Sequence, residues 1–405
     1  MKRFVVILLA ACLILGCGIG YFAAKNEKQD AGAPVALADP EPGADAAPAE
    51  IAAPRRIDFA AIRALYPMDE VVGDVDGRPV TWEEYFYWIA DMGARAQSYI
   101  DTMALYGQAF DWEDKVDPES EDSFAQYTLQ MAQDCVRQMN SVEAIAEENG
   151  VTLSAEDEAA LAEKHRQNIA AACGEGASEE DFNRYLEENY VSRGMYDRLN
   201  TLGYLFNNIP DKLYGVNGAD VSEEEALAYL REQDYLSASH ILFKTVDLTT
   251  YEPLDEAAAA EKLEQAKAVS EELRAIEDVD ERVRRFAELK EQYCEDTGKV
   301  QYPDGYLFTP GTTASEFEHG VKALEEYEVS EPVLSSFGYH VIMRLPLSVE
   351  LPMDYSEDGE PLTARALYAD AKYGELMNAR IDGSVLTLRG DVEAFDLTKY
   401  LVDAE

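Results

Sequence analysis

Two short stretches decide the fold of this chain: Ala238-Ser239-His240-Ile241-Leu242-Phe243 and Phe337-Gly338-Tyr339-His340-Val341-Ile342. Each places a histidine inside an apolar run that favours a β-strand, and the 405 residues contain only four histidines. A histidine on an apolar strand is usually a core residue whose hydrogen bonds are satisfied. Two of them, in the first and last strands of one stretch, weigh against a purely structural interpretation.

The sequence between these two stretches has a coherent α/β pattern. The strand around His240 precedes an Ala-, Glu- and Leu-rich helix expected at 254–275, and a second helix is expected at 280–293. The strand around His340 closes the stretch. This pattern predicts a small antiparallel sheet flanked by helices.

Five further motifs lie in the same stretch. They are Phe286-Ala287-Glu288-Leu289, Tyr293-Cys294-Glu295-Asp296, the loop from Pro303 to Gly311, Glu316-Phe317-Glu318, and Val329-Ser330-Glu331-Pro332-Val333. Together with the two histidine segments, they resemble the parvulin family of peptidyl-prolyl isomerases over about 234–347. Each motif alone is weak, whereas their combination in this order is specific.

The resemblance implies roles for individual residues. His240 and His340 would face each other and order the hydrogen bonds of the site, and Asp296 falls where relatives carry a catalytic Cys or Asp. Phe317 would wall the proline pocket, and Ser335 aligns with a hydroxyl residue near the second histidine. Phe308 and Thr313 complete the expected substrate-binding set. No cofactor is implied, and no Cys/His spacing predicts a metal site.

The sequence departs from the family pattern at two places. Pro303-Asp304-Gly305-Tyr306 replaces a glycine-rich loop, and Thr313 stands where relatives often carry Met, so a shallower or more polar proline pocket is expected. The loop from Lys244 to Pro253 has no Arg cluster that could grip a phosphate. Specificity for phosphorylated substrates is therefore not expected.

The N-terminus, residues 1–25, has the pattern of an export signal: Lys2 and Arg3 precede an apolar run from Phe4 to Ala24. Ile14-Leu15-Gly16-Cys17 resembles a lipobox, in which Cys17 would be lipidated. Alternatively, the run is long enough to span a bilayer as an uncleaved anchor. Either outcome would attach the rest of the chain to the outer face of the cell membrane.

A helical region is expected between the export signal and the histidine segments. Residues 26–58 are rich in Ala, Pro and acidic residues and predict a disordered linker. Region 59–233 begins with a hairpin at 71–80 and a helix whose capping box is formed by Thr81 and Glu84. This opening resembles the chaperone domain of the PrsA and SurA foldases. Including that one, helices are expected at 82–106, 121–149, 155–173, 179–190, 192–207 and 222–232, and Ser154 with Asp157 and Ser222 with Glu225 would cap two of them.

These expectations give an α+β chain with a helical chaperone domain at 59–233 and a parvulin domain at 234–348. A tail at 349–405, with a helix at 363–381, is too small for a core of its own. By the same resemblance it completes the chaperone domain. Cys135 and Cys173 lie on separate expected helices and either pair or remain thiols.

The expected function is that of a membrane-tethered extracytoplasmic foldase that isomerises X-Pro bonds in unfolded exported proteins. The alternative is a holdase whose parvulin module binds clients without useful catalysis. A net charge of −46 argues against nucleic acid as a partner. Protease and hydrolase signatures such as Gly-x-Ser-x-Gly are absent from the sequence, and the oligomeric state is left open.

Overall fold

The structure is a computed structural model that describes residues 54–118, 120–246, 252–355 and 361–403. The fold class is α+β, as predicted from the sequence. The chain forms two units, each with its own core. The helical unit runs up to Lys212 and resumes at Gly374, and the sheet unit comprises Leu213–Tyr373.

Several predictions concern residues that the structure does not describe. The export signal at 1–25, Cys17 within it, and the linker as far as residue 53 lie outside the described ranges. So does part of the loop after the first histidine strand, residues 247–251. In the part of the chain that is described, no helix has the length and apolar character needed to cross a bilayer.

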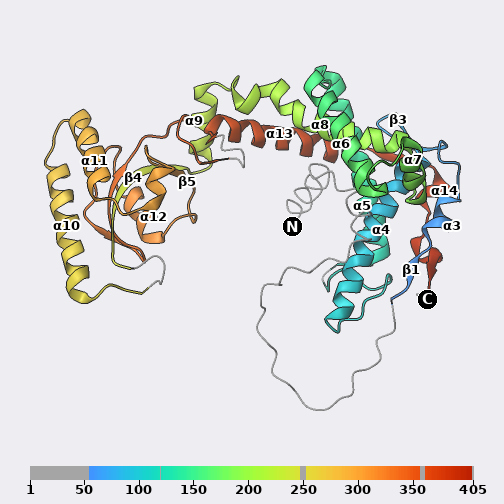
Figure 1. Ribbon diagram of the computed structural model, residues 1–405, viewed down its shortest axis with the longest axis horizontal. Coiled ribbons are helices and arrows are strands. Elements are labelled where there is room, and N and C mark those ends of the chain that lie inside the picture. The colour runs from blue at the N-terminus through green and yellow to red at the C-terminus, as the bar shows by residue number, and fades with distance from the viewer. Residues whose placement is uncertain (1–53, 119, 247–251, 356–360, 404–405) are drawn as a thin grey trace, which may run out of the picture. The chain divides into compact units, whose positions relative to one another are not determined.

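The helical unit consists of long helices and two small sheets (Figure 1). In chain order its elements are β1 (Arg56–Ile57), α3 (Phe59–Arg63), β2 (Val71–Val75), β3 (Arg78–Thr81), α4 (Trp82–Leu105), α5 (Phe124–Asn149), α6 (Ala155–Cys173), α7 (Glu179–Glu188), α8 (Arg193–Tyr214), β10 (Leu386–Leu388), α14 (Gly390–Glu393), η4 (Leu397–Tyr400) and β11 (Leu401–Val402). Helix α8 runs on into the sheet unit, and α13 (Ala364–Gly383) leads back from it.

The hairpin expected at 71–80 forms, and the C-terminal tail extends its sheet. Asp76 and Gly77 have φ angles of 52° and 85°, the left-handed conformation that tight hairpin turns require. Strand β10 pairs with β2, so the strand order is β10-β2-β3, and β11 pairs with β1. Both ends of the described chain thus contribute strands to the helical unit.

Serine caps set the starts of the helices. The capping boxes predicted at Ser154 with Asp157 and at Ser222 with Glu225 are both present. Ser123 caps α5 in the same way, so that helix begins at Phe124 and not at 121. The box predicted at Thr81 is only half formed: the Thr81 hydroxyl accepts a bond from the Glu84 N–H, but the Glu84 side chain turns elsewhere.

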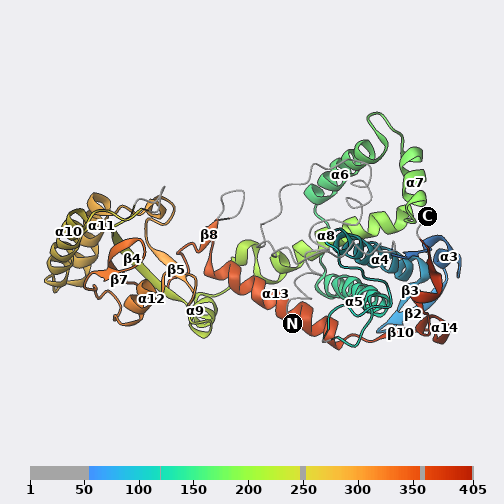
Figure 2. The same cartoon turned by 90° about the horizontal axis from the view of Figure 1, so that it is seen from below.

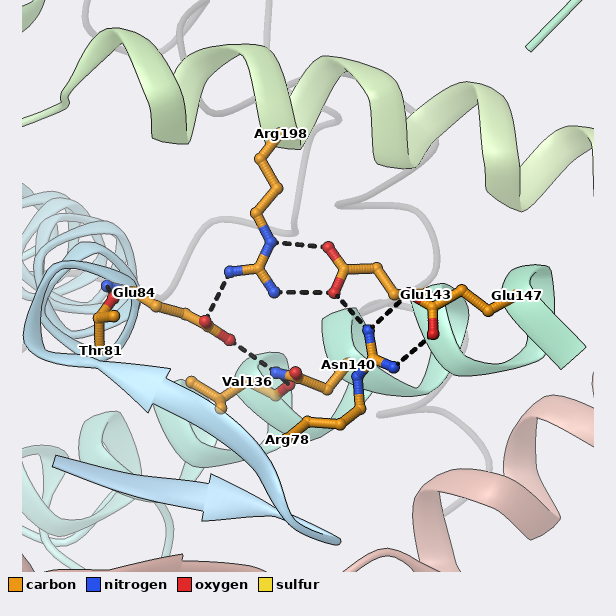
Figure 3. Close-up of polar contacts among 8 residues, drawn as sticks. All are labelled: Arg78, Thr81, Glu84, Val136, Asn140, Glu143, Glu147 and Arg198. Carbon is orange, nitrogen blue, oxygen red and sulfur yellow. Dashed lines mark hydrogen bonds and ion pairs between the residues drawn. The ribbon is translucent and has the colours of Figure 1, made fainter. Parts of the chain in front are cut away.

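The Glu84 carboxylate is buried in an ion network that joins α4, α5 and α8 (Figure 3). It accepts hydrogen bonds from Asn140 Nδ2 and from Arg198 Nη1, each at 2.6 Å. Arg198 also holds both oxygens of Glu143 at 2.6 and 2.9 Å, and Arg78 from β3 bridges Glu143 to Glu147. Burial raises the pKa of Glu84, while Arg198 and Asn140 oppose that shift.

Most of the aromatic side chains on α4 belong to the core. The buried ones are Trp82, Tyr85, Phe86, Tyr87, Trp88 and, in the following loop, Trp112. At the far end of α4, Leu105 and Tyr106 are 87% and 68% exposed. A groove of about 500 Å³ runs beside this end of α4, lined in part by Phe59, Ala94 and Leu105.

The sheet unit contains the four-stranded antiparallel sheet that the histidine segments predict. Its elements are η2 (Val216–Gly218), α9 (Glu223–Glu232), β4 (Leu236–Lys244), α10 (Glu256–Arg274), α11 (Val279–Tyr293), η3 (Thr297–Val300), β5 (Tyr306–Phe308), α12 (Ser315–Lys322), β6 (Val333–Leu334), β7 (Gly338–Arg344), β8 (Asp354–Tyr355), β9 (Pro361–Leu362) and the first half of α13.

The strand order β5-β4-β7-β6 places the first and last strands of the module side by side at the centre of the sheet. Helices α10 and α11 cover one face, where Ile241, Phe243 and Val341 join their core (Figure 2). Helix α12 covers the other face with a second core that includes Ala238 and Ile342. Because side chains alternate along a strand, both histidines lie on the α12 face.

The remaining parts of the sheet unit pack around α9. Leu230 on that helix shares a core with Val349, Leu351 and Ala369. The tail residues up to Tyr373 therefore lie with the sheet unit, and those from Gly374 onward lie with the helical unit. Cys173 carries a free thiol, so the bridge to Cys135 that the sequence left open does not form.

Candidate active site

The two histidines meet across the central strand pair. In the β4–β7 register His240 lies opposite Ile342 and His340 lies opposite Leu242, so the imidazoles are diagonal neighbours on one face. Their Nδ1 atoms are 3.2 Å apart, and their ring centroids are 5.0 Å apart. Both side chains are buried. The convergence expected of two residues 100 positions apart is thus confirmed.

Asp296 is held next to His240 by the end of the second helix of the module. The chain leaves α11, and Asp296 becomes the N-cap of the short helix η3, accepting a bond from the Gly298 N–H at 2.9 Å. Its Oδ2 lies 2.9 Å from His240 Nε2 and 2.5 Å from the Tyr306 hydroxyl. Burial disfavours the charge, but the bonds from His240, Tyr306 and Gly298 outweigh it and hold the pKa of Asp296 well below its usual range.

Ser335 occupies the other side of the pair. Its hydroxyl lies 2.7 Å from His340 Nε2, and it accepts a bond from the Phe337 N–H at 3.1 Å. The turn that presents it needs Gly338, whose φ is 143° and whose added Cβ would lie 2.2 Å from the Phe243 carbonyl. This local geometry places the hydroxyl within reach of the imidazole.

These contacts fix one direction for every proton in the chain of bonds. The Asp296 carboxylate can only accept, so His240 Nε2 donates and His240 Nδ1 is left as an acceptor. His340 Nδ1 must then donate to it, which leaves His340 Nε2 to accept the Ser335 hydroxyl proton. Both imidazoles are neutral in this arrangement. Consistently, burial and the neighbouring His240 lower the pKa of His340 to about 3.

An aromatic and apolar cluster covers the imidazoles. The Phe317 ring meets His240 and His340 edge-on, with centroid distances of 5.2 and 5.4 Å. Phe308 packs on Phe317 at 5.8 Å. Nearby, the Thr313 hydroxyl is buried and has no hydrogen-bond partner among the described residues. The structure therefore brings together His240, His340, Asp296, Ser335, Phe317 and Phe308, and Thr313 lies two residues before α12.

Sequence reasoning missed Tyr306, which contributes the shortest bond to Asp296. The sequence shows only a tyrosine at the start of a strand, after a loop that departs from the family pattern. Cys294, in the same motif as Asp296, is buried, and its sulfur accepts a bond from the Leu242 N–H of β4 at 3.4 Å. Burial raises the pKa of this thiol.

Lys290 was also missed. It is buried on α11, and its ammonium donates to the Ser239 hydroxyl at 3.0 Å and to the Pro303 carbonyl at 2.8 Å. It thereby ties the loop in front of Tyr306 to strand β4. Across the described ranges, no group of three or more His, Cys, Asp or Glu side chains is placed to hold a metal ion.

Comparisons with known proteins agree with this geometry. Residues 240–345 match the family model of the rotamase, or PPIC-type PPIase, domain. Over 120 residues the chain is 39% identical to foldase protein PrsA 1 of Bacillus cereus, an alignment that covers 29% of this chain and 34% of the relative. Over 218 residues it is 30% identical to foldase protein PrsA 4 of the same species, covering 43% of this chain and 69% of the relative.

Among solved structures, that of PrsA from Bacillus subtilis aligns over 78% of this chain and 91% of its own, with 14% identity and a TM-score of 0.24. The alignments thus span about a third of the first curated relative and more than two thirds of the second. On the strength of the second relative and the rotamase match, the chain belongs to the PrsA foldase family, and residues 240–345 form its PPIC-type peptidyl-prolyl cis–trans isomerase domain.

Proposed function

We propose that this chain is a membrane-tethered extracytoplasmic foldase. Its parvulin module, 234–348, isomerises X-Pro bonds in exported proteins that have not yet folded. Its helical unit, which runs up to Lys212 and resumes at Gly374, holds those clients. The observation that carries the proposal is the directed chain of bonds from Asp296 through both histidines to Ser335, covered by Phe317.

Prolyl isomerisation breaks no covalent bond, so the site needs no nucleophile. The X-Pro amide resists rotation because of its partial double-bond character, with a barrier of about 18–20 kcal/mol. The uncatalysed reaction takes about tens to hundreds of seconds. A catalyst must bind the twisted amide better than either planar form. The twisted amide has less charge separation than the planar amide, and so an apolar surface favours it.

The proposed roles follow from the contacts. Phe317 and Phe308 receive the proline ring, and Thr313, the residue before Ala314 of the same cluster, offers its hydroxyl to the substrate backbone. The two neutral imidazoles provide a fixed pattern of dipoles beneath the amide. Because every proton in their chain of bonds has one direction, this pattern is set before substrate binds.

Asp296 acts in this proposal by orienting His240. Three protein groups, His240, Tyr306 and Gly298, already bond its two oxygens. The carboxylate therefore selects the Nε2–H tautomer of His240 and has little capacity left for the substrate amide.

The proposed location rests on the N-terminal sequence. Lipidation of Cys17 or an uncleaved anchor would tether the chain, and the Ala-, Pro- and acid-rich residues that follow would separate the folded units from the membrane. In the helical unit, the groove beside the end of α4 and the exposed Leu105 and Tyr106 are the proposed contacts for unfolded clients.

One observation favours the second candidate, a holdase with a weak or inactive module. Tyr306 stands in the loop that departs from the family's glycine-rich pattern, and its phenol reaches into the polar network of the site. A site altered in this way could bind a proline segment while turning it over slowly.

Two assays on the full chain separate these candidates. The first follows a denatured protein whose refolding is limited by an X-Pro bond, and the second follows light scattering of an aggregating client. A foldase accelerates the first, and His240→Ala abolishes that acceleration while the suppression of scattering remains. His319→Ala, an exposed histidine on α12, is the matched control. If the unaltered chain suppresses light scattering but does not accelerate refolding, the holdase is favoured.

A further inference from the structure

The phenol of Tyr306 shares one carboxylate oxygen with a histidine of the site. Its hydroxyl lies 2.5 Å from Asp296 Oδ2, the atom that also lies 2.9 Å from His240 Nε2. A carboxylate oxygen can accept two hydrogen bonds. The two donors therefore compete for the negative charge of the same atom.

Gly298 provides the space for this phenol. An added Cβ at Gly298 would lie 2.4 Å from the Tyr306 hydroxyl, well inside van der Waals contact. The same glycine donates its N–H to the second oxygen of Asp296. Tyr306, Gly298 and Asp296 thus form an interlocked set, in which the absence of a side chain at one residue admits the hydroxyl of another.

The Tyr306 ring is itself held in place. It packs on the His240 ring with centroids 5.5 Å apart and on the Tyr302 ring with centroids 5.1 Å apart. Lys290 fixes the loop in front of it through the carbonyl of Pro303. The hydroxyl therefore approaches Asp296 on a ring whose position is set by packing, which is what a precise second hydrogen bond needs.

We propose that Tyr306 is a positioning residue that, by sharing Asp296 Oδ2 with His240, keeps the histidine pair neutral and in a single tautomer. The phenol withdraws negative charge from the carboxylate. Without it, Asp296 stabilises a positively charged His240 more strongly, and the pair takes up a proton at a higher pH. Once His240 carries the extra proton, its Nδ1 donates, and His340 must accept at Nδ1 and move its own proton to Nε2, toward Ser335, so the single direction of the chain of bonds is lost. This inference rests on the proposed isomerase function only where it concerns turnover.

Other charged or titratable groups around Asp296 are few in the described structure. Lys290 and Cys294 act on it through space from the α11 side, and Lys299 on η3 and Asp304 in the loop before Tyr306 act on Lys290. His340 faces it from β7. Within the described residues, the bonds to Asp296 Oδ2 come from His240 and Tyr306, so the phenol is the group that modulates the negative charge facing His240.

The test is an NMR titration of the imidazoles in the full chain, labelled at histidine, between pH 4 and 8. Tyr306→Phe is expected to raise the pH at which the pair takes up a proton by about one unit, as loss of a bond to a charged group implies. Gly298→Ala, whose new Cβ displaces the hydroxyl, is expected to give the same shift. Tyr293→Phe, whose ring packs on Phe243, is the matched control and should titrate like the unaltered chain.

Isomerase activity provides the second measurement. In the Tyr306→Phe chain, the pH below which kcat/KM falls should move up together with the imidazole titration. An unchanged titration in a Tyr306→Phe chain that keeps its circular dichroism would overturn the inference. If the unaltered chain has no isomerase activity, the proposed function fails while the titration still decides the role of Tyr306.

Discussion

His240 and His340 are separated by 100 positions in the chain, yet their Nδ1 atoms lie 3.2 Å apart at the centre of one sheet. The register of β4 and β7 makes them diagonal neighbours, and Asp296 and Ser335 sit at the outer nitrogens of the pair. One consequence is that each imidazole has one nitrogen that donates and one that accepts. The pair is therefore sensitive to a single added proton.

The stability of the sheet unit is expected to fall in mild acid because of His340. Its pKa is about 3 in the folded chain, against about 6.5 when unfolded. Between these values the unfolded chain binds a proton that the folded chain does not. The free energy of unfolding therefore decreases as the pH is lowered, by about 3 kcal/mol from pH 7 to pH 4. Hydrogen exchange of the β4 and β7 amides, corrected for intrinsic rates, measures this change.

His340→Gln should remove this part of the pH dependence, whereas His319→Gln, at an exposed position, should leave it in place. Asp296 does not interfere in this range. Its pKa is lowered, so its contribution to stability is present above its unfolded value of about 4 and is lost only below it. Equal slopes for the His340→Gln and unaltered chains would contradict the assignment.

The second prediction concerns the ion network shown in Figure 3 and its contribution to the stability of the helical unit. Arg198→Met leaves the buried Glu84 carboxylate without its cationic partner and should cost about 3–5 kcal/mol of unfolding free energy. All three tryptophans of the chain, Trp82, Trp88 and Trp112, belong to this unit, so urea unfolding followed by tryptophan fluorescence reports on it alone.

The double variant Glu84→Gln with Arg198→Met should recover part of that loss, because no buried charge then remains unpaired. Arg184→Met, which removes an exposed pair with Asp181, is the matched control and should leave the urea midpoint nearly unchanged. A midpoint for Arg198→Met equal to that of the control would show that the network contributes little.

The C-terminal strands are expected to stabilise the helical unit in preference to the sheet unit. Deleting residues 384–405 removes β10 from β2 and β11 from β1, which leaves two unpaired strand edges. The tryptophan-detected urea midpoint should drop and light scattering should rise, while the histidine NMR signals of the sheet unit stay in place. Loss of the histidine signals, together with an unchanged urea midpoint from tryptophan fluorescence, would contradict this prediction.

The sequence predicted the elements of the site better than its hydrogen bonds. The strands of His240 and His340 could be identified because apolar, β-prone runs are local patterns, and the serine caps could be placed for the same reason. Glu84 was assigned to a helix cap because its true partner, Arg198, is 114 positions away. Tyr306 was missed because its bond to Asp296 depends on how β5 and η3 pack, which no local pattern records.

Attachment to the membrane is tested at Cys17, which lies outside the described residues. If Cys17 is lipidated, Cys17→Ser should yield an unprocessed precursor that migrates more slowly and takes up no fatty-acid analogue. Cys12→Ser, in the same apolar run, is the matched control and should be processed normally. A wild-type chain that takes up no analogue, with a mobility that Cys17→Ser does not change, would favour the uncleaved anchor instead.

The central claim, that the histidine pair and its aromatic cover catalyse prolyl isomerisation, is tested most directly by NMR exchange spectroscopy. The measurement gives the cis–trans exchange rate of an unphosphorylated X-Pro peptide with and without the full chain. We predict clear acceleration at catalytic concentrations, and a loss of about ten- to a hundredfold in kcat/KM for Phe317→Ala, since the proline ring loses its apolar contact. An exchange rate that the unaltered chain leaves at its uncatalysed value would contradict the account.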